Sequence, residues 1–385
     1  MKISPQLQQV NYPPISEVKQ WISGREFSAD APLVDLCQAI PDYQPADGLI
    51  NHLQNKLTDP SMSVYSPDEG LLTVRQSVSA WYERRYGAGP NEDQICMTMG
   101  ASQAFWLAML TLCQSGDEVI VQLPAYFDHP MGLQALGIKP RYLPYDGATG
   151  MPDPQKIAAV ITSKTKAILL VTPSNPTGTV LPPALIDEIY QLAKKHDIAL
   201  VLDETYNAFL PGETKAHQLF EKVDWGENFI HIASFGKTFA LTGYRAGALV
   251  ASAEFIYHAL KVQDSMVVCQ PRITQQAIAY GCDNLDRWVE GNASMMQQRH
   301  DRFFSLFNVS KNPFTLCASG AFFAWVKHPW THLNGRQAAR KMADDYNVIC
   351  LPGEVFGPHL DDYLRLAFGN VKLEQIELAV ERFYI

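Results

Sequence analysis

Between residues 71 and 251, continuous apolar segments alternate with segments of helical spacing. The apolar segments, which we expect to be strands, span residues 118–123, 167–171, 198–202, 229–233 and 246–251. Their hydrophobic residues are mostly consecutive, which is typical of strands buried on both faces. Helices are expected near residues 71–86, 102–114, 129–136, 154–161 and 182–196. This pattern predicts an α/β domain in which helices cover both faces of a mainly parallel sheet.

The segments on either side of this region have a different character. Residues 1–40 are rich in proline and aromatic residues, and we expect an arm with little helix of its own. Toward the carboxyl end the sequence indicates a helix over 284–307, a strand over 320–326 and a helix over 334–346. We therefore expect an arm that forms part of a small domain (1–40), a large domain (41–283) and a small α+β domain (284–385).

The composition indicates a compact protein. Of the 385 residues, 47% are hydrophobic and 18% are charged, which is typical of a globular chain with a sizeable core. At ~100–200 residues per domain, the length suggests two or three domains. The formal net charge of −9 argues against a nucleic-acid partner, because phosphate binding needs a clustered basic surface.

The seven cysteines are scattered and form no CxxC pair. This usage fits reduced thiols better than a disulfide or zinc framework, so we expect no metal. The amino terminus lacks the apolar core of a signal peptide, and no apolar run approaches the ~20 residues of a membrane span. We therefore expect a cytoplasmic protein with no membrane partner.

One lysine stands at the end of a predicted buried strand. Lys237 follows the strand over 229–233 and is flanked by small and hydroxylic residues. Partial desolvation lowers the pKa of an amine and frees its lone pair, so this position suits a lysine that forms a Schiff base. The alternative is a solvated loop lysine, and the neighbouring motifs argue against it.

Polar side chains also end the two preceding strands. Asn175 follows the strand over 167–171, and Asp203 follows the strand over 198–202. Alone, the Asn-Pro-Thr-Gly segment indicates a turn, and the aspartate could cap a helix. Ligands of such sheets gather beyond the carboxyl ends of the strands, so three unrelated turns are a poor explanation for Asn175, Asp203 and Lys237.

Together these residues fit a pyridine-ring cofactor. An ionised Asp203 can keep a ring nitrogen protonated, which makes the ring an electron sink for a carbanion. Asn175 and Tyr206 can hydrogen-bond a ring hydroxyl, and Lys237 can form the imine. Tyr126 follows another strand and can stack on the ring, with core packing as the alternative.

A phosphate group on such a cofactor has two candidate contacts. The first is the start of a predicted helix, where backbone N–H groups and the helix dipole favour an anion; it comprises Gly100, Ala101 and Ser102. The second flanks the lysine, where Ser234 can add a hydroxyl and Arg245 a bidentate guanidinium contact.

The combined motifs resemble those of the class I and II pyridoxal-phosphate aminotransferases, the aspartate-aminotransferase-like enzymes of fold type I. The resemblance rests on Gly100-Ala101-Ser102, Asn175-Pro176-Thr177-Gly178, Asp203 with Tyr206, and Ser234 with Lys237 and Arg245. It implies a large domain with a mainly parallel sheet of the seven-stranded type between helices, and a smaller α+β domain. It also implies pyridoxal 5′-phosphate as cofactor, with an amino acid and a 2-keto acid as substrates.

The resemblance extends to three further segments. Residues 65–70 look like the family segment whose tyrosine reaches the phosphate of the partner subunit, which would make Tyr65 a cofactor contact across a homodimer with shared sites. Residues 352–357 and 363–368 look like the carboxy-terminal motifs. By that match Arg365 would clamp the α-carboxylate of the substrate, beside Asn175, Tyr126 and Ala39.

Two positions depart from the family pattern. Gly236 stands where members often have a serine, which removes one phosphate contact. Ala39 stands where many members have a glycine close to the substrate carboxylate, which changes the shape of the pocket. Neither departure alters the residues expected around the ring.

The predicted function is therefore that of an aminotransferase, with Lys237, Asp203 and Tyr206 as its catalytic residues. A carbon–sulfur lyase of the same fold would share every residue named above and is the alternative. A cofactor-sensing transcription regulator is a remote alternative, because it needs a basic DNA-binding domain and about 40 non-basic residues precede the aminotransferase part. A nicotinamide dehydrogenase is disfavoured because no G-x-G-x-x-G follows a strand.

The sequence also bears on the substrate side chain. Dicarboxylate-specific relatives commonly use a second arginine, and by register it would fall in residues 262–271, which contain no arginine or lysine. Asp264 would repel an acidic side chain, and burying an unpartnered carboxylate is costly. Arg272 lies just beyond this stretch, and a shifted register would place it where those relatives have the second arginine. Neutral, apolar or aromatic amino acids would be favoured by Tyr12, Ile15, Ile40 and Met266.

Overall fold

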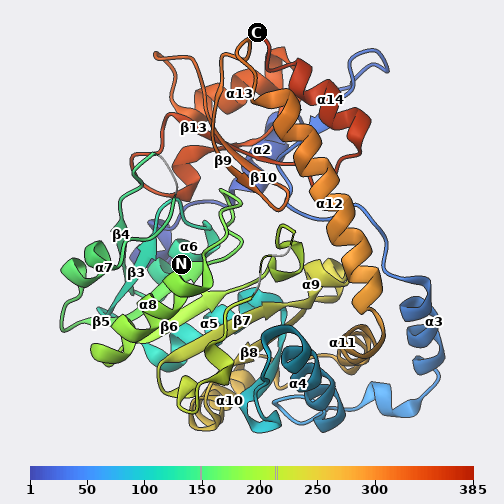
Figure 1. The fold of residues 1–385 in the computed structure, drawn as a ribbon, viewed down its shortest axis with the longest axis vertical. Coiled ribbons are helices and arrows are strands. Elements are labelled where there is room, and N and C mark those ends of the chain that lie inside the picture. The colour runs from blue at the N-terminus through green and yellow to red at the C-terminus, as the bar shows by residue number, and fades with distance from the viewer. Residues whose placement is uncertain (148–149, 213, 215) are drawn as a thin grey trace.

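The computed structural model describes residues 1–147, 150–212, 214 and 216–385. Across these residues the large sheet has seven strands in the order β2-β8-β7-β6-β5-β3-β4 (Figure 1). The strands are β2 (Ile95–Met99), β3 (Glu118–Gln122), β4 (Lys139–Leu143), β5 (Thr165–Val171), β6 (Ala199–Asp203), β7 (Phe229–Ser234) and β8 (Ala246–Val250). Neighbouring strands are parallel except at β8, which runs antiparallel to β2 and β7. The predicted α/β fold with a mainly parallel sheet is confirmed.

Successive strand residues enter two hydrophobic clusters, one on each face of the sheet. On β3, Val119 and Val121 belong to one cluster, and Ile120 belongs to the other. Burial on both faces is the reason for the continuous apolar segments. The helices around the sheet are α3 (Asp47–Lys56), α4 (Leu72–Tyr86), α5 (Gly100–Leu112), α6 (Asp128–Ala135), α7 (Pro154–Val160), α8 (Pro183–Lys195), α9 (Phe235–Thr238), α10 (Ala253–Val267) and α11 (Arg272–Asn284). None of the helices in the described residues has the length and hydrophobicity that a membrane span requires.

The carboxy-terminal part is built on a four-stranded antiparallel sheet. Its strand order is β12-β13-β10-β9, from β9 (Thr315–Gly320), β10 (Phe323–Lys327), β12 (Leu351–Pro352) and β13 (Tyr363–Ala367). The helices are α12 (Asp286–Phe307), α13 (Gly335–Asp345) and α14 (Leu373–Glu381). The predicted strand over 320–326 is present as β10, but it begins later than predicted, because the chain turns at residues 321–322 between β9 and β10. At this turn the backbone of Gly320 meets Gly178, where an added Cβ would lie 2.3 Å from the Gly320 nitrogen.

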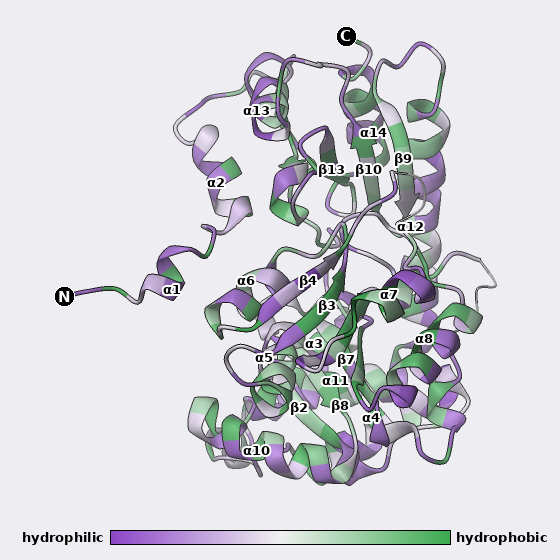
Figure 2. Cartoon of the chain, turned by 90° about the vertical axis from the view of Figure 1, so that its left-hand side faces the viewer, coloured by the Kyte–Doolittle hydropathy of each residue, from purple (hydrophilic) through white to green (hydrophobic). Residues whose placement is uncertain are grey.

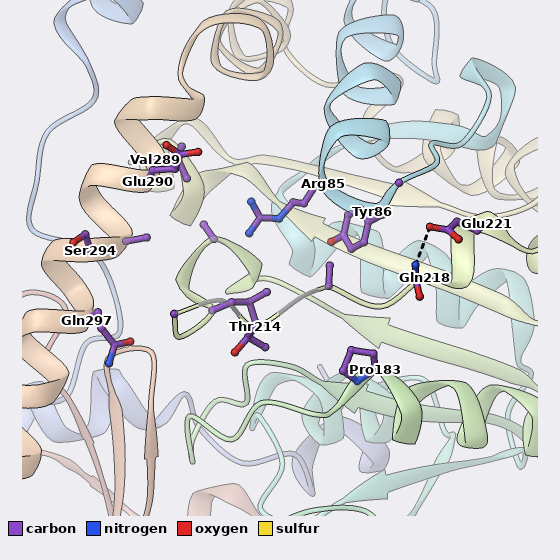
Figure 3. A pocket seen from close by; sticks show the side chains of 16 residues that line it. Arg85, Tyr86, Pro183, Thr214, Gln218, Glu221, Val289, Glu290, Ser294 and Gln297 are labelled. Atoms are coloured by element: carbon purple, nitrogen blue, oxygen red, sulfur yellow. Dashed lines mark hydrogen bonds between the residues drawn. The ribbon is translucent and has the colours of Figure 1, made fainter.

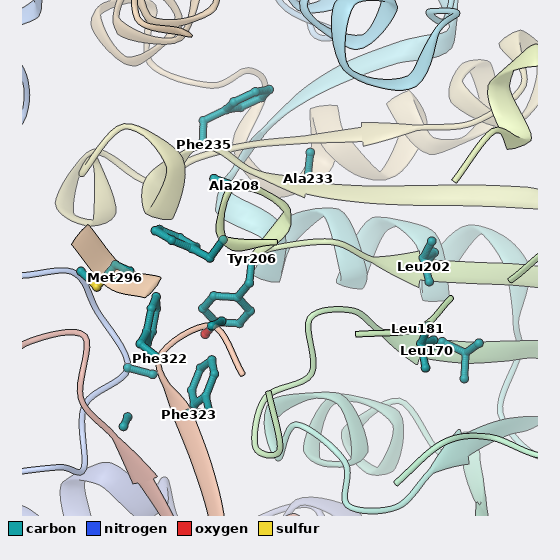
Figure 4. Close-up of a cluster of buried hydrophobic side chains, with 14 of the residues drawn as sticks. Leu170, Leu181, Leu202, Tyr206, Ala208, Ala233, Phe235, Met296, Phe322 and Phe323 are labelled. Atoms are coloured by element: carbon teal, nitrogen blue, oxygen red, sulfur yellow. The ribbon is translucent and has the colours of Figure 1, made fainter. Parts of the chain in front are cut away.

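The two sheets occupy separate parts of the molecule, and α12 runs from one to the other (Figure 1). Aromatic side chains join the parts: the Tyr206 ring lies 5.5 Å from Phe322 and 5.0 Å from Phe323, centroid to centroid (Figure 4). Because α11 ends at Asn284 and α12 begins at Asp286, we propose that the carboxy-terminal domain boundary falls at this junction. The boundary near residue 40 stays a prediction.

The amino-terminal arm is more helical than its sequence predicted. It contains α1 (Pro5–Gln8) and α2 (Pro14–Trp21), which lie along one side of the molecule (Figure 2). Pro14 is the first residue of α2, a position where the fixed φ of proline favours a helix. After α2, β1 (Val34–Asp35) pairs in parallel with β11 (Val348–Ile349) and so joins the arm to the carboxy-terminal part.

Candidate functional site

A cavity of about 450 Å³ lies at the carboxyl ends of the parallel strands. It is lined by polar residues from the ends of β6 and β7, by the start of α5, and by Arg365 of β13. Of the residues that the sequence singled out as a site, it brings together Ala39, Gly100, Ala101, Ser102, Tyr126, Asn175, Asp203, Tyr206, Ser234, Lys237, Arg245 and Arg365. The expected gathering of polar side chains at one sheet edge is therefore present in the fold.

Tyr65, predicted as a cofactor contact, does not line this cavity. Its side chain is 77% exposed. Its backbone carbonyl accepts a hydrogen bond from Arg272 Nη2 at 2.6 Å. An exposed tyrosine has no role in the cavity of its own chain, so the predicted contact across a dimer stays a prediction.

The cavity holds Lys237 in a partly buried position. The residue belongs to the short helix α9, directly after β7, and its Nζ donates to the Ala39 carbonyl at 3.0 Å. Burial, together with the positive charges of Arg245 and Arg365, lowers the pKa of Lys237 to about 8. At pH 7 roughly one such amine in ten is unprotonated, far more than for an ordinary lysine.

Asp203 ends β6 and is buried. Its Oδ2 lies 3.1 Å from Nε2 of His129. Its Oδ1 accepts from the Thr205 backbone N–H at 2.9 Å and from the Thr205 hydroxyl at 2.7 Å. These three donors hold the carboxylate in one orientation at the cavity wall. An ionised aspartate held in this way can bind a cationic ring N–H.

Asn175 links a tyrosine and an arginine inside the cavity. Its Nδ2 donates to the Tyr206 hydroxyl at 3.5 Å, and its Oδ1 accepts from Arg365 Nη1 at 3.2 Å. All three side chains are buried. This orientation of the amide presents the tyrosine hydroxyl and the guanidinium side by side at the cavity wall.

The start of α5 and Arg245 form a cradle that fits an anion. Gly100 has a φ of +80°, and a Cβ there would lie 2.6 Å from Arg245 Nη2. Arg245 itself adopts a left-handed conformation and donates to the Thr242 carbonyl at 2.9 Å and the Met99 carbonyl at 3.3 Å. Among the described residues no side chain caps the start of α5, so its first N–H groups can bind a phosphate.

Arg365 is a buried cation without an acidic partner in the described part of the chain. Its side chain is 1% exposed, and Nη2 donates to the Cys37 carbonyl. Nε has no hydrogen-bond partner among the described residues, and burial lowers the pKa of this guanidinium. A buried charge without a counter-ion is costly, so this position favours an anionic ligand such as a carboxylate.

Sequence reasoning missed His129, Thr205 and Asp128, which also line the cavity. The Tyr126 hydroxyl donates to Asp128 Oδ2 at 2.5 Å. The sequence did contain a signal for two of them, because Asp128 and His129 follow closely after the predicted strand over 118–123. Polar residues at the end of that strand are as informative as Asp203 is at the end of its own. Thr205 had no such signal, since its role depends on the turn after β6.

A second buried polar cluster lies behind the cavity wall. Glu204 Oε2 lies 2.8 Å from His231 Nε2 and 3.3 Å from His217 Nε2, and it accepts from the Tyr86 hydroxyl at 2.6 Å. Carboxylate oxygens and imidazole nitrogens commonly bind metal ions, so these three residues could in principle form a metal site. However, Nδ1 of His217 accepts from the Leu219 backbone N–H at 3.2 Å, which places the proton on Nε2. That nitrogen then carries a hydrogen on the side of Glu204, 3.3 Å away, and offers no lone pair to a metal ion, so the set fits a buried polar cluster better than a metal site.

We expect Glu204→Gln to lower the free energy of unfolding at pH 7 by about 1.5–3 kcal/mol, the usual contribution of hydrogen bonds to a buried charged group. Burial by itself raises the pKa of Glu204, but His217 and His231 outweigh it and bring the pKa well below 4.5. The ionised group therefore stabilises the fold above about pH 4.5, and this contribution is lost as the pH falls. Urea unfolding at pH 7 and pH 4 measures it, with Glu83→Gln on the surface as control. An equal difference from wild type at both pH values would contradict the assignment.

Comparison with known proteins identifies relatives over nearly the whole chain. A sequence model of the family "Aminotransferase class I and II" matches residues 31–383. The chain is 27% identical to "Aromatic aminotransferase ISS1" of Arabidopsis thaliana, covering 91% of this chain and 88% of that protein. It is also 27% identical to "Aspartate aminotransferase" of Pyrococcus abyssi, covering 89% and 88%. The solved structure of substrate-bound BacF from Bacillus subtilis is 25% identical, covers 100% of this chain and 98% of that chain, and superposes with a TM-score of 0.91.

Proposed function

Because the chain belongs to the class I and II aminotransferases, which depend on pyridoxal phosphate, we propose that it transfers amino groups between a neutral α-amino acid and a 2-keto acid. The observation that carries the proposal is the shared cavity of Lys237 and Arg365. One supplies an amine with a pKa of about 8, and the other a buried guanidinium without an acidic partner in the described residues. A proton-transferring base and a carboxylate clamp are the two groups that amino transfer requires from the protein.

The residues present fit pyridoxal phosphate. Asp203 would hold the ring nitrogen, Asn175 and Tyr206 would hold the ring hydroxyl, and Tyr126 would stack on the ring. The phosphate would lie in the cradle formed by residues 100–102, Ser234 and Arg245, where a side chain at Gly100 would collide with the arginine. When bound, pyridoxal phosphate supplies an electron sink that accepts the electron pair left on Cα.

In this proposal the side chains of the cavity perform three tasks. Arg365 binds the α-carboxylate of the amino acid and fixes its orientation. The Lys237 amine, unprotonated in part near neutral pH, would take the proton from Cα and pass it on to the cofactor instead of giving it back to Cα. Asp203, held by His129 and Thr205, keeps its negative charge aimed at the ring nitrogen. Each task uses a contact or a charge that the cavity already holds.

The cavity also supports a neutral side chain on the substrate. Among its described lining residues, the cations are Lys237, Arg245 and Arg365, all of which have roles at the cofactor or the α-carboxylate. A distal carboxylate would meet Asp128 and no further cation among the described lining residues, which is costly. The apolar lining residues that remain for a side chain include Val10, Ile15, Ile40, Trp106 and Met131.

Two residues that the sequence assigned to this pocket do not line it in the single chain. Tyr12 and Met266 are 62% and 41% exposed. Ile15 and Ile40 do line it, the first from α2 and the second from the segment after β1. Arg272, which could have supplied a second cation, instead contacts the Tyr65 carbonyl outside the cavity. We propose that the neutral preference rests on the isoleucines, and that exposed Tyr65 serves the partner site of a homodimer.

The proposed function is tested with a panel of amino donors. We expect methionine, phenylalanine and alanine to exceed aspartate in kcat/KM with a fixed 2-keto acid, by about tenfold or more, because an unpaired carboxylate is costly to bury. Formation of the amino acid product is measured with and without the keto acid. Release of ammonia and a keto acid without any acceptor would instead identify a carbon–sulfur lyase. An aspartate efficiency above all three donors would contradict the substrate proposal while leaving amino transfer intact.

A further inference from the structure

A second cavity, of about 790 Å³, lies outside the catalytic cavity (Figure 3). Its walls come from the end of α4, from residues near 208–221 and from the first half of α12. It shares no lining residue with the Lys237 cavity. Nothing in the proposed amino transfer uses it.

Three charged side chains among the described residues line this cavity. Arg85 projects from the end of α4 toward the side of Glu290 on α12, and Glu221 lies on the opposite side, beyond Tyr86 (Figure 3). Within the described part of the chain, none of the three forms an ion pair, and Arg85 Nε has no hydrogen-bond partner. Glu221 accepts only a neutral hydrogen bond, from Gln218 at 3.2 Å. Among the described lining residues, one guanidinium and two carboxylates, none of them in an ion pair, complement a ligand that carries both signs of charge.

Apolar side chains make up much of the remaining wall. Ala208, Leu210 and Ala216 lie on one side, and Val289 and Ala293 of α12 lie on the other. Such a wall would shelter an uncharged side chain from water. The described lining residues supply two carboxylates and one cation, a balance that fits a dianionic phosphate poorly.

A short segment separates this cavity from the catalytic one. Asp203 and Tyr206 line the catalytic cavity, whereas Ala208 lines the second cavity. Arg85 Nη2 donates to the Asn207 carbonyl, and Asn207 Nδ2 donates to the Tyr86 hydroxyl at 2.9 Å. A molecule bound to Arg85 would therefore be linked through Asn207 to the segment that carries Asp203 and Tyr206, two proposed catalytic residues.

We propose that this cavity is a second binding site for a zwitterionic α-amino acid with an uncharged side chain. Arg85 binds the carboxylate through its planar fork. Glu290, with Glu221 opposite, binds the ammonium group, and the apolar wall accommodates the side chain. The ligand belongs to the same chemical class as the proposed amino donor, which makes the site suited to sensing the supply of substrate.

The test measures, by isothermal titration calorimetry, how many amino-acid molecules bind to each chain of the cofactor-loaded enzyme. The probe is L-α-methylmethionine, which has no Cα proton and cannot complete amino transfer. We expect two molecules per chain for wild type and one for Arg85→Gln, with the site that depends on Arg365 kept. Arg84→Gln is the matched control: the neighbouring arginine pairs with Asp286 instead of lining the cavity, and this variant should bind two.

Arg85 also stacks on Trp81, so its replacement could disturb the fold. Glu290→Gln avoids this problem, because the side chain is exposed on α12 and has no ion pair in the described residues. We expect it to weaken the second site about tenfold while the first site is unchanged, as for the loss of one charge-assisted contact. One molecule per chain in wild type would overturn the proposal. Two molecules of unchanged affinity in both Arg85→Gln and Glu290→Gln would overturn it as well.

Discussion

Replacing Lys237 by alanine is expected to lower the rate of amino transfer by at least ~10²–10⁴-fold, the usual contribution of a positioned proton-transfer group. The reason is that no other described amine lines the cavity. The remaining contacts, from Asp203, Arg245 and the start of α5, should still hold pyridoxal phosphate with reduced affinity. Initial rates with methionine as donor measure the loss, and Lys194→Ala, on the surface beside Asp224, is the control.

A second readout of Lys237 does not depend on turnover. With a pKa of about 8, the amine of the cofactor-free protein should capture pyridoxal phosphate faster as the pH rises through this value, and the rate should level off about one pH unit above it. Absorbance of the new chromophore follows this capture, which should be absent in Lys237→Ala. A variant that transaminates near the wild-type rate, or a capture rate that rises steadily to pH 10, would contradict the assignment.

The ends of the parallel strands explain why so much of the site was predictable. Asn175, Asp203 and Lys237 each follow an apolar segment, and the sheet topology brings the carboxyl ends of parallel strands to one edge. Their common location therefore follows from local pattern and fold class together. Arg365 lies on a different sheet, and the family resemblance placed it near the site where hydrophobic periodicity gave no guide.

What the sequence did not predict depends on contacts between distant segments. Glu204, His217 and His231 are separated in sequence and meet only when β6, β7 and the segment before Leu219 pack together. The turn between β9 and β10 coincides with the close approach of Gly320 to Gly178, about 140 residues earlier. In both cases the deciding interaction has no local periodicity.

The solvent exposure of two side chains explains why they do not line the substrate pocket as predicted. Tyr12 and Met266 are apolar enough for a substrate pocket, but both remain largely exposed in the single chain. Tyr65 shares this property, and its proposed role lies in the partner's site. A sequence pattern identifies which side chains suit a pocket, whereas the packing of the arm and the assembly of subunits determine which of them reach it.

Replacing Asp203 by asparagine is expected to slow amino transfer on the order of 10²–10³-fold, the typical loss when one preorganised electrostatic group is removed from an active site. Asparagine keeps the size of the side chain and can still accept from Thr205, but it removes the charge that would hold the ring nitrogen protonated. Cofactor binding should survive, because Lys237, Arg245 and the start of α5 are unchanged. Asp203→Glu keeps the charge but moves it by one methylene from His129, so it should retain more activity than the asparagine variant.

Cofactor content and turnover, measured on the same preparations, separate the two possible roles of Asp203. A catalytic carboxylate predicts full cofactor content with slow turnover in Asp203→Asn, and Asp224→Asn at the surface should match wild type in both. If Asp203 only terminates β6, its replacement would lower stability while the turnover of the folded fraction stayed normal. That result would remove the ionised partner of the ring nitrogen from the proposal, and the three donors from His129 and Thr205 would then be structural contacts alone.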